Sequence, residues 1–161
     1  MRTEHEKFMA MALEEARSGV EAGERPFGSV VVREGEVLGR GRNLCNSTFD
    51  PTAHAETLAI RDAATNLKNV SLGGCTLYST CEPCPMCCGA TLFAEIDTLV
   101  IGVRHATLRE VTTWFQNYVH GLFAQSEYTA DRLVELTGAK LELVTGVLFD
   151  ECAEMYRVWR G

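Results

Sequence analysis

Two short segments of the chain hold residue types that bind metal ions. One contains His54 and Glu56, two positions apart, and the other contains Cys84 and Cys87, three positions apart. Imidazole nitrogen and thiolate sulfur are donors that zinc prefers, and a catalytic zinc site keeps three protein ligands and one open position for water. The sequence therefore predicts one Zn²⁺ per chain, bound by His54, Cys84 and Cys87.

The spacing of these residues requires two helix starts that meet. Residues three apart share a face at the start of a helix, so Cys84 and Cys87 can bind one ion. The positive end of that helix favours their thiolate forms. Residues two apart do not share a helix face, so His54 must lie at the very beginning of its helix for Glu56 to reach the same site. Residues 50–52 supply capping and helix-start residues at the right place.

Glu56 is predicted to carry protons rather than to bind the metal. Zinc lowers the pKa of a bound water to about 7, which makes hydroxide available at neutral pH. Glu56 would take the proton of that water and pass it to a departing amine. The predicted reaction is a hydrolytic deamination, in which zinc-bound hydroxide attacks a carbon that carries an amino group and ammonia is released.

The elements that position these residues follow from apolar periodicity and from turn and cap signals. The predicted helices are a first one from Thr3 to about Gly19, then about Ala53–Leu67, about Met86–Ala94, a mainly helical region Ala106–Leu136, and Leu148–Trp159. The predicted strands are Phe27–Val32, Glu36–Gly41, Cys75–Thr80, Thr98–Val103 and Leu141–Thr145, with a polar loop at Asn43–Asp50.

This order predicts an α/β fold with three layers, α/β/α, around a mixed sheet of about five strands. The turn at Glu34–Gly35 favours an antiparallel hairpin, while the later alternation of strands and helices implies right-handed crossovers and parallel pairing. The sequence contains no repeat and no linker, and 161 residues suit one domain, so we expect a single domain over residues 1–161.

Composition narrows the cellular setting and the partners. The amphipathic N-terminal segment lacks the apolar stretch of a secretory signal, and no apolar run approaches the ~20 residues of a membrane span, so we expect a cytoplasmic protein without membrane contact. Seven cysteines, an odd number, argue against a disulfide framework. A net charge of -7 disfavours a nucleic-acid partner without excluding one and fits a small-molecule substrate better.

The pattern H-x-E followed by P-C-x-x-C is typical of zinc nucleobase deaminases. The chain matches it at His54, Glu56, Pro83, Cys84 and Cys87. It thereby resembles the cytidine deaminase-like superfamily, in particular the branch of guanine deaminases, fungal-type cytosine deaminases and tRNA adenosine deaminases. The resemblance extends over nearly the whole chain and is carried by Arg25–Val32, Gly41–Asn43, Asp50–Glu56 and Leu77–Ala90.

The resemblance implies a cytidine deaminase-like fold and a homodimer. It also implies that Asn43 hydrogen-bonds the substrate ring and that the Ala55 backbone contacts that ring. From the residues alone, Asn43 is equally a turn residue after a strand. We further expect Phe27 and Trp114 to contact substrate. Trp114, Phe115 and Tyr118 would form either an aromatic wall for a flat ring or an ordinary helix face, and their helical spacing favours the helix face.

The first prediction for the substrate is a free nucleobase or related aminoheterocycle of the guanine, cytosine or aminotriazine type. It follows from the acidic composition and from the sequence of Arg104–Val111. This segment differs from the stretch that is typical of tRNA adenosine deaminases at the corresponding position. The alternatives are a tRNA-specific adenosine deaminase, which forms inosine, and a free nucleoside deaminase. Specificity is expected to lie in the segment Ala106–Leu136.

Two other interpretations of the cysteines, and one of the whole domain, compete with a catalytic zinc site. Cys81, Cys84, Cys87 and Cys88 would form a closed structural zinc site, but that leaves His54 and Glu56 unexplained. A redox dithiol at Cys84 and Cys87 would be indifferent to chelators, whereas a zinc enzyme is sensitive to them. A non-catalytic binding module of the same fold would have no reason to keep Glu56.

Overall fold

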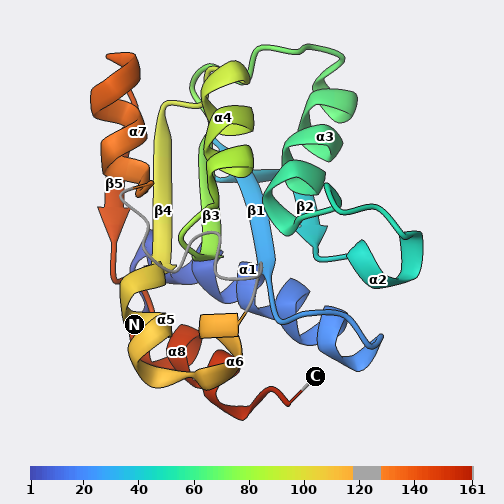
Figure 1. Ribbon diagram of the computed structural model, residues 1–161. Coiled ribbons are helices and arrows are strands. Elements are labelled where there is room, and N and C mark those ends of the chain that lie inside the picture. Colours follow the sequence, from blue (N-terminus) through green and yellow to red (C-terminus); the bar gives the residue numbers. More distant parts are fainter. Residues whose placement is uncertain (118–127, 161) are drawn as a thin grey trace.

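Five strands form one mixed sheet in the order β2-β1-β3-β4-β5 (Figure 1). The computed structural model describes residues 1–117 and 128–160. Strand β1 is antiparallel to both of its neighbours, and β3, β4 and β5 are mutually parallel. The predicted mixed five-stranded sheet is therefore confirmed. The strands are β1 (Gly28–Arg33), β2 (Glu36–Arg42), β3 (Thr76–Cys81), β4 (Thr98–Val103) and β5 (Glu142–Thr145).

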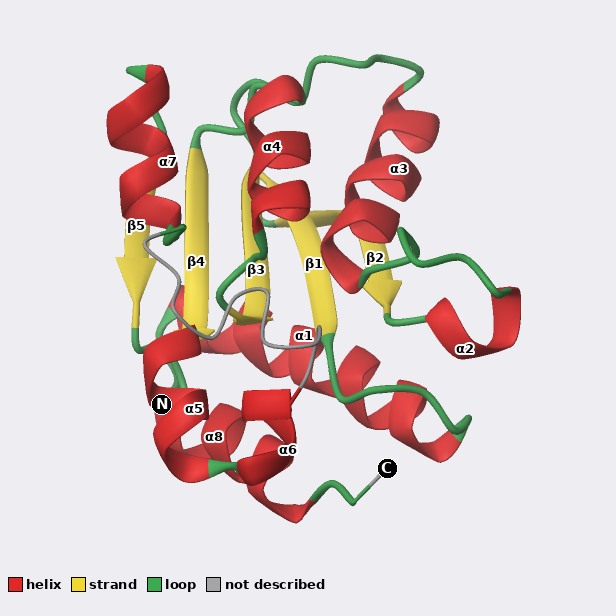
Figure 2. Ribbon diagram, viewed as in Figure 1, coloured by secondary structure: helices red, strands yellow, loops and turns green. Residues whose placement is uncertain are grey.

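Helices cover both faces of this sheet and complete the predicted three layers (Figure 2). Helices α3, α4 and α7 pack on one face, and α1 and α8 pack on the other, each over its own buried apolar cluster. Within the described part of the chain, no helix combines the length and the apolar character needed to cross a membrane. The helices are α1 (Glu4–Glu21), α2 (Cys45–Thr48), α3 (Ala55–Leu67), α4 (Pro85–Phe93), α5 (His105–Val111), α6 (Thr113–Asn117), α7 (Ala130–Thr137) and α8 (Phe149–Val158).

Local sequence signals explain the N-terminal elements. Thr3 caps α1 through a capping box, in which its hydroxyl accepts the Glu6 N–H and the Glu6 carboxylate accepts the Thr3 N–H. The hairpin turn at Glu34 and Gly35 has positive φ at both residues, 53° and 80°, as in the type I′ turns that join twisted strands. Both elements lie where the sequence predicts them.

Two regions differ in detail from the prediction. The segment predicted as a polar loop, Asn43–Asp50, contains the short helix α2, which ends at Phe49 in the left-handed conformation. The mainly helical region predicted over Ala106–Leu136 contains α5, α6 and most of α7, while residues 118–127 lie outside the described part of the chain. Apolar periodicity is weak in both regions, so it could not place the breaks between short helices.

All the strand ends that carry candidate residues meet at one edge of the sheet. Because β1 is antiparallel to β2 and to β3, strands β2, β3 and β4 all end where β1 begins. Asn43 follows β2, Phe27 precedes β1, Cys84 follows β3 and His105 follows β4. Ligand sites of open α/β sheets lie at this kind of edge, beyond the carboxyl ends of strands.

Gly41 allows the start of α3 to lie directly against β2. A Cβ atom at this position would come within 2.0 Å of the Ala55 carbonyl oxygen and within 2.5 Å of the Ala59 nitrogen, both backbone atoms that cannot move alone. The absence of a side chain at Gly41 therefore fixes how closely the first turn of α3, which carries the residues after His54, approaches the sheet.

We predict that Gly41→Ala lowers the free energy of unfolding by about 1–3 kcal/mol, since the new methyl group must push α3 away from β2. Urea denaturation measures this change. The matched control is Gly89→Ala in α4, where an added Cβ meets nothing within 4 Å and helix propensity favours alanine by about 0.5–1 kcal/mol. Equal stability of Gly41→Ala and the wild type would show that this close approach is not a constraint.

Candidate metal centre and active site

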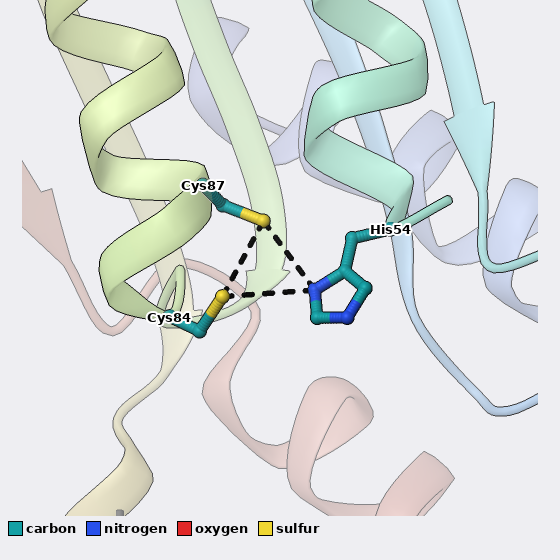
Figure 3. Close-up of side chains that lie close together, drawn as sticks. All are labelled: His54, Cys84 and Cys87. Atoms are coloured by element: carbon teal, nitrogen blue, oxygen red, sulfur yellow. Dashed lines mark hydrogen bonds between the residues drawn. The ribbon is translucent and has the colours of Figure 1, made fainter. Parts of the chain in front are cut away.

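His54, Cys84 and Cys87 converge in the structure (Figure 3). The His54 Nδ1 atom lies 3.6 Å from the Cys84 sulfur and 3.4 Å from the Cys87 sulfur, and the two sulfurs are 3.6 Å apart. The imidazole comes from the start of α3 and both thiols come from the start of α4. Three donors from distant parts of the sequence thus form one compact triangle.

The triangle has the dimensions of three corners of a tetrahedral zinc site. A zinc ion about 2.3 Å from each sulfur and about 2.0–2.1 Å from the nitrogen requires about 3.8 Å between the sulfurs and about 3.5 Å between sulfur and nitrogen. The measured separations of 3.6, 3.6 and 3.4 Å agree with these values. Two sulfurs and one nitrogen also form a donor set that zinc accepts, so these residues fit the ion.

Both helices begin at a ligand. His54 and Cys84 are the N-cap residues of α3 and α4, with extended backbone conformations, and neither side chain is used to cap its helix. Pro85 occupies the first turn of α4, where proline is well tolerated. Cys87 lies three residues after Cys84 and therefore on the same side of that turn, as the spacing predicts.

The loop before His54 is held by side-chain hydrogen bonds. The Asp50 carboxylate accepts the backbone N–H and the hydroxyl of Thr52, at 2.8 and 2.7 Å. The Thr57 hydroxyl donates to the carbonyl oxygens of Thr52 and His54, at 2.8 and 2.9 Å. These bonds connect the loop to the first turn of α3 and fix the backbone that directs the imidazole.

Burial and neighbouring thiols shift the titration of the site. Burial raises the pKa of Glu56 to about 7, and a nearby Cys84 thiolate acts in the same direction. The hydrogen bond between the two thiols lowers the pKa of Cys84 to about 4, against the effect of its burial. Burial acts to lower the pKa of His54, but the hydrogen bond to Cys84 and the negative charges of Glu56 and Cys84 together raise that pKa.

A narrow cavity, lined in part by His54 and Cys84, opens beside the triangle. Glu56 has only 6% of its side-chain surface exposed and lines this cavity from the second position of α3. The lining residues are Phe27, Asn43, His54, Glu56, Glu82, Cys84, His105 and Phe115.

Asn43 and Phe27 lie together on the wall of the cavity. The Asn43 backbone N–H donates to the Phe27 carbonyl oxygen at 3.1 Å, so the two ends of the hairpin hold each other. The Asn43 Oδ1 atom accepts the Cys45 N–H at 3.2 Å. Asn43 is therefore a turn residue and a cavity-lining residue at once, and the two sequence-based interpretations are compatible.

Ala55 and Trp114 do not line the cavity. Ala55 is the first residue of α3 and is fully buried. The Trp114 indole N–H donates to the Tyr156 carbonyl oxygen at 2.9 Å. The Trp114 ring packs against the Phe27 ring, with 6.3 Å between the ring centroids. Phe115, the next residue, reaches the cavity instead. The predicted substrate contacts of Ala55 and Trp114 stay predictions, and Tyr118 lies outside the described residues.

Glu82 and His105 also line the cavity, although their sequence positions predict no role in the site, whereas Phe115 belongs to the aromatic group considered above. Glu82 is 2% exposed, and its carboxylate accepts the backbone N–H groups of His105 and Ala130, each at 3.0 Å, and an N–H of Arg104 at 3.1 Å. The available signal was that Glu82 and His105 follow, by one and two residues, buried strands that end on the same side of the sheet.

The neighbouring cysteines take no part in the triangle. Cys88 is buried and its thiol donates to the Pro83 carbonyl oxygen at 3.4 Å. Cys81 is 2% exposed and belongs to the apolar cluster on the opposite face of the sheet. Among the described residues, only His54, Cys84 and Cys87 are grouped closely enough to bind a metal, so the closed four-cysteine site is not what the chain forms.

Comparison with known families gives the same result as the geometry. Residues 2–103 match the family described as the cytidine and deoxycytidylate deaminase zinc-binding region. The chain belongs to this family. It is accordingly a zinc-dependent hydrolytic deaminase, and the cytidine deaminase-like fold expected from the resemblance is confirmed by its structural neighbours.

Three relatives of this deaminase differ in their reported substrates. The tRNA-specific adenosine deaminase of Haemophilus influenzae is 37% identical over 92% of this chain and 79% of that protein. The guanine deaminase of Bacillus subtilis is 42% identical over 66% of this chain and 69% of that protein. The chloroplastic tRNA(adenine(34)) deaminase of Arabidopsis thaliana is 39% identical over 95% of this chain, which spans only 12% of the length of that relative.

A solved structure from work on A-to-I editing by tRNA:A34 deaminases is similar to this deaminase over most of the fold. Its TM-score is 0.74 at 34% sequence identity, and the match covers 92% of this chain and 98% of the other. The similarity therefore includes the segment beyond residue 103, where the family model ends.

We predict that the purified chain binds one zinc ion and that Cys87→Ala loses it, because two of three protein ligands cannot hold the ion tightly. Elemental analysis of the dialysed proteins measures the stoichiometry. Cys88→Ala is the matched control, since this adjacent thiol points to Pro83 and not to the triangle. Full zinc retention in Cys87→Ala would rule out the predicted ligand set.

Proposed function

We propose that this deaminase converts adenosine in tRNA to inosine. The observation that carries the proposal is the share of this chain that each relative matches. The tRNA deaminases of Haemophilus influenzae and Arabidopsis thaliana match 92–95% of the chain, including its C-terminal part, whereas the guanine deaminase and two further tRNA-specific adenosine deaminases match 59–66%. The relatives thus favour the alternative over a free nucleobase, which was the first prediction from the sequence. A nucleic-acid partner is accordingly proposed despite the net charge of -7.

In the proposed reaction, water adds its oxygen to the carbon that carries the amino group, and the amino group leaves as ammonia. His54, Cys84 and Cys87 would hold the zinc, which when bound supplies a water that is acidic enough to attack at neutral pH. Glu56 takes one proton from that water and delivers it to the leaving amine. Its buried position in the same cavity keeps this proton from bulk solvent.

The cavity that Glu56 and the triangle line is narrow, so the target nucleotide must leave its stack in the RNA to bring its base there. Enzymes that modify a base within a nucleic acid turn the nucleotide outward into a pocket. The rings of Phe27 and Phe115 offer apolar surface to such a base. The Asn43 amide, which is bonded to Cys45, lines the same cavity and would hydrogen-bond the edge of the base. The rest of the RNA would lie outside the cavity.

A free base such as guanine is the second candidate. The 42% identity to the guanine deaminase of Bacillus subtilis supports it, and so does the acidic composition of the chain. The unusual sequence of residues 104–111 points the same way. Both candidate substrates would bind in the same cavity beside the same triangle. They differ in whether the reacting heterocyclic ring is attached to an RNA or is free.

Ammonia release from a panel of substrates tests the proposal. The panel contains an anticodon stem-loop with adenosine at the wobble position, the same stem-loop with guanosine there, free adenosine, guanine and cytosine. We expect turnover of the adenosine stem-loop and little on the free compounds. Turnover of guanine or cytosine with no activity on RNA would overturn the tRNA assignment in favour of the second candidate.

We predict that Glu56→Gln lowers kcat by about 10²–10⁴-fold, because glutamine has the shape of glutamate but cannot accept the proton. Zinc content should stay at the wild-type value, since Glu56 is not a ligand. Steady-state assays on the best substrate, with elemental analysis of the same samples, check both statements. Activity within tenfold of the wild type would remove Glu56 from the proposed mechanism.

The homodimer implied by the family resemblance stays a proposal. Light scattering on the zinc-loaded protein tests it. A mass of twice 17.8 kDa is the expected result, and a mass of one chain across the working concentration range would contradict it.

A further inference from the structure

We propose that His105 is a specificity-determining residue, which hydrogen-bonds the substrate in the cavity. The inference rests on the proposed reaction taking place in this cavity, whether the ring is part of an RNA or free. His105 is the first residue of α5, two residues after the end of β4, and it lines the same cavity as Asn43 and His54. No catalytic step requires it.

The ring nitrogens of His105 lack the partners that a structural histidine would have. The residue is 93% buried, since only 7% of its surface is exposed. Within residues 1–117 and 128–160, neither ring nitrogen makes a hydrogen bond, and the only fully enclosed side-chain nitrogen or oxygen without a partner is Arg42 Nε, so the His105 nitrogens are accessible from the cavity. His5 shows the contrast, because its Nδ1 atom pairs with the Tyr78 hydroxyl at 3.0 Å. A ligand in the cavity would supply the missing partner.

The position of His105 is fixed from two sides. Its backbone N–H donates to the buried Glu82 carboxylate at 3.0 Å, and Glu82 lies two residues before Cys84. Its ring packs against Phe115, with 5.4 Å between the ring centroids. A side chain held in this way is already ordered before substrate arrives, so little conformational entropy opposes its hydrogen bond.

The chemistry of the imidazole defines what it recognises. Burial lowers the pKa of His105, which favours the neutral ring at pH 7. A neutral imidazole has one N–H donor and one nitrogen acceptor. It can therefore pair with a substrate edge that offers an acceptor or a donor, as the edges of aminoheterocycles do, and it discriminates against a ligand that leaves it unpaired.

The test measures binding and turnover of His105 variants. In a Glu56→Gln background, which holds the ligand without consuming it, we expect His105→Phe to weaken the binding of the best substrate in the panel by about tenfold, the value of one hydrogen bond. In the otherwise unchanged enzyme, His105→Phe should raise KM with kcat nearly constant and should change the ratio of kcat/KM between the two best substrates. His105→Asn keeps a donor and an acceptor, so its binding affinity and KM should lie between those of the wild type and those of His105→Phe.

His5→Phe is the matched control, because it removes a histidine outside the cavity, and we expect no change in KM or in the substrate ratio. Equal zinc content and similar melting temperatures keep the comparison valid, and His105→Asn replaces His105→Phe if the latter does not fold. Unchanged binding and an unchanged ratio would overturn the inference. Silence of the wild type on the whole panel would overturn the proposed function instead, and the binding measurement on the adenosine stem-loop and guanine would still decide the role of His105.

Discussion

The approach of two helix N-termini, those of α3 and α4, is the constraint on which the rest of the site depends. His54 and Cys84 occupy the N-caps, so their side chains point beyond the helix ends, toward one another. Three features hold the helices at this separation: the β1–β3 pairing, the turn after β3, and the lack of a side chain at Gly41. A shift of one helix along the sheet would separate the nitrogen from the sulfurs.

The same edge of the sheet also builds the cavity. Strands β2, β3 and β4 end there and β1 begins there. Only short connections are therefore needed to bring four residues to the cavity, namely Asn43, Phe27, Glu82 and His105. The buried Glu82 carboxylate then joins the ends of β3 and β4 to the start of α7. A buried carboxylate is costly unless its oxygens are paired, and here backbone N–H groups and Arg104 provide the pairing.

Much of this arrangement follows from the sequence, because local signals specify it. Strand Thr98–Val103 has the same bounds in the prediction and in the structure, and the hairpin follows from its glycine turn. The triangle follows from donor types and helix spacing. The roles of Glu82 and His105 do not, since they arise from contacts between β3, α5 and α7 that no local pattern encodes. Trp114 and Phe115 are adjacent aromatic residues, and only tertiary packing decides which one faces the cavity.

X-ray absorption at the zinc edge of the purified protein tests the central claim most directly, because it reports the atoms around the ion without reference to substrate. The account predicts two sulfurs at about 2.3 Å and two lighter atoms at about 2.0–2.1 Å, namely the His54 nitrogen and an exchangeable water. A shell of four sulfurs, or a shell without sulfur, would contradict it, because either would mean that α3 and α4 do not meet around the ion.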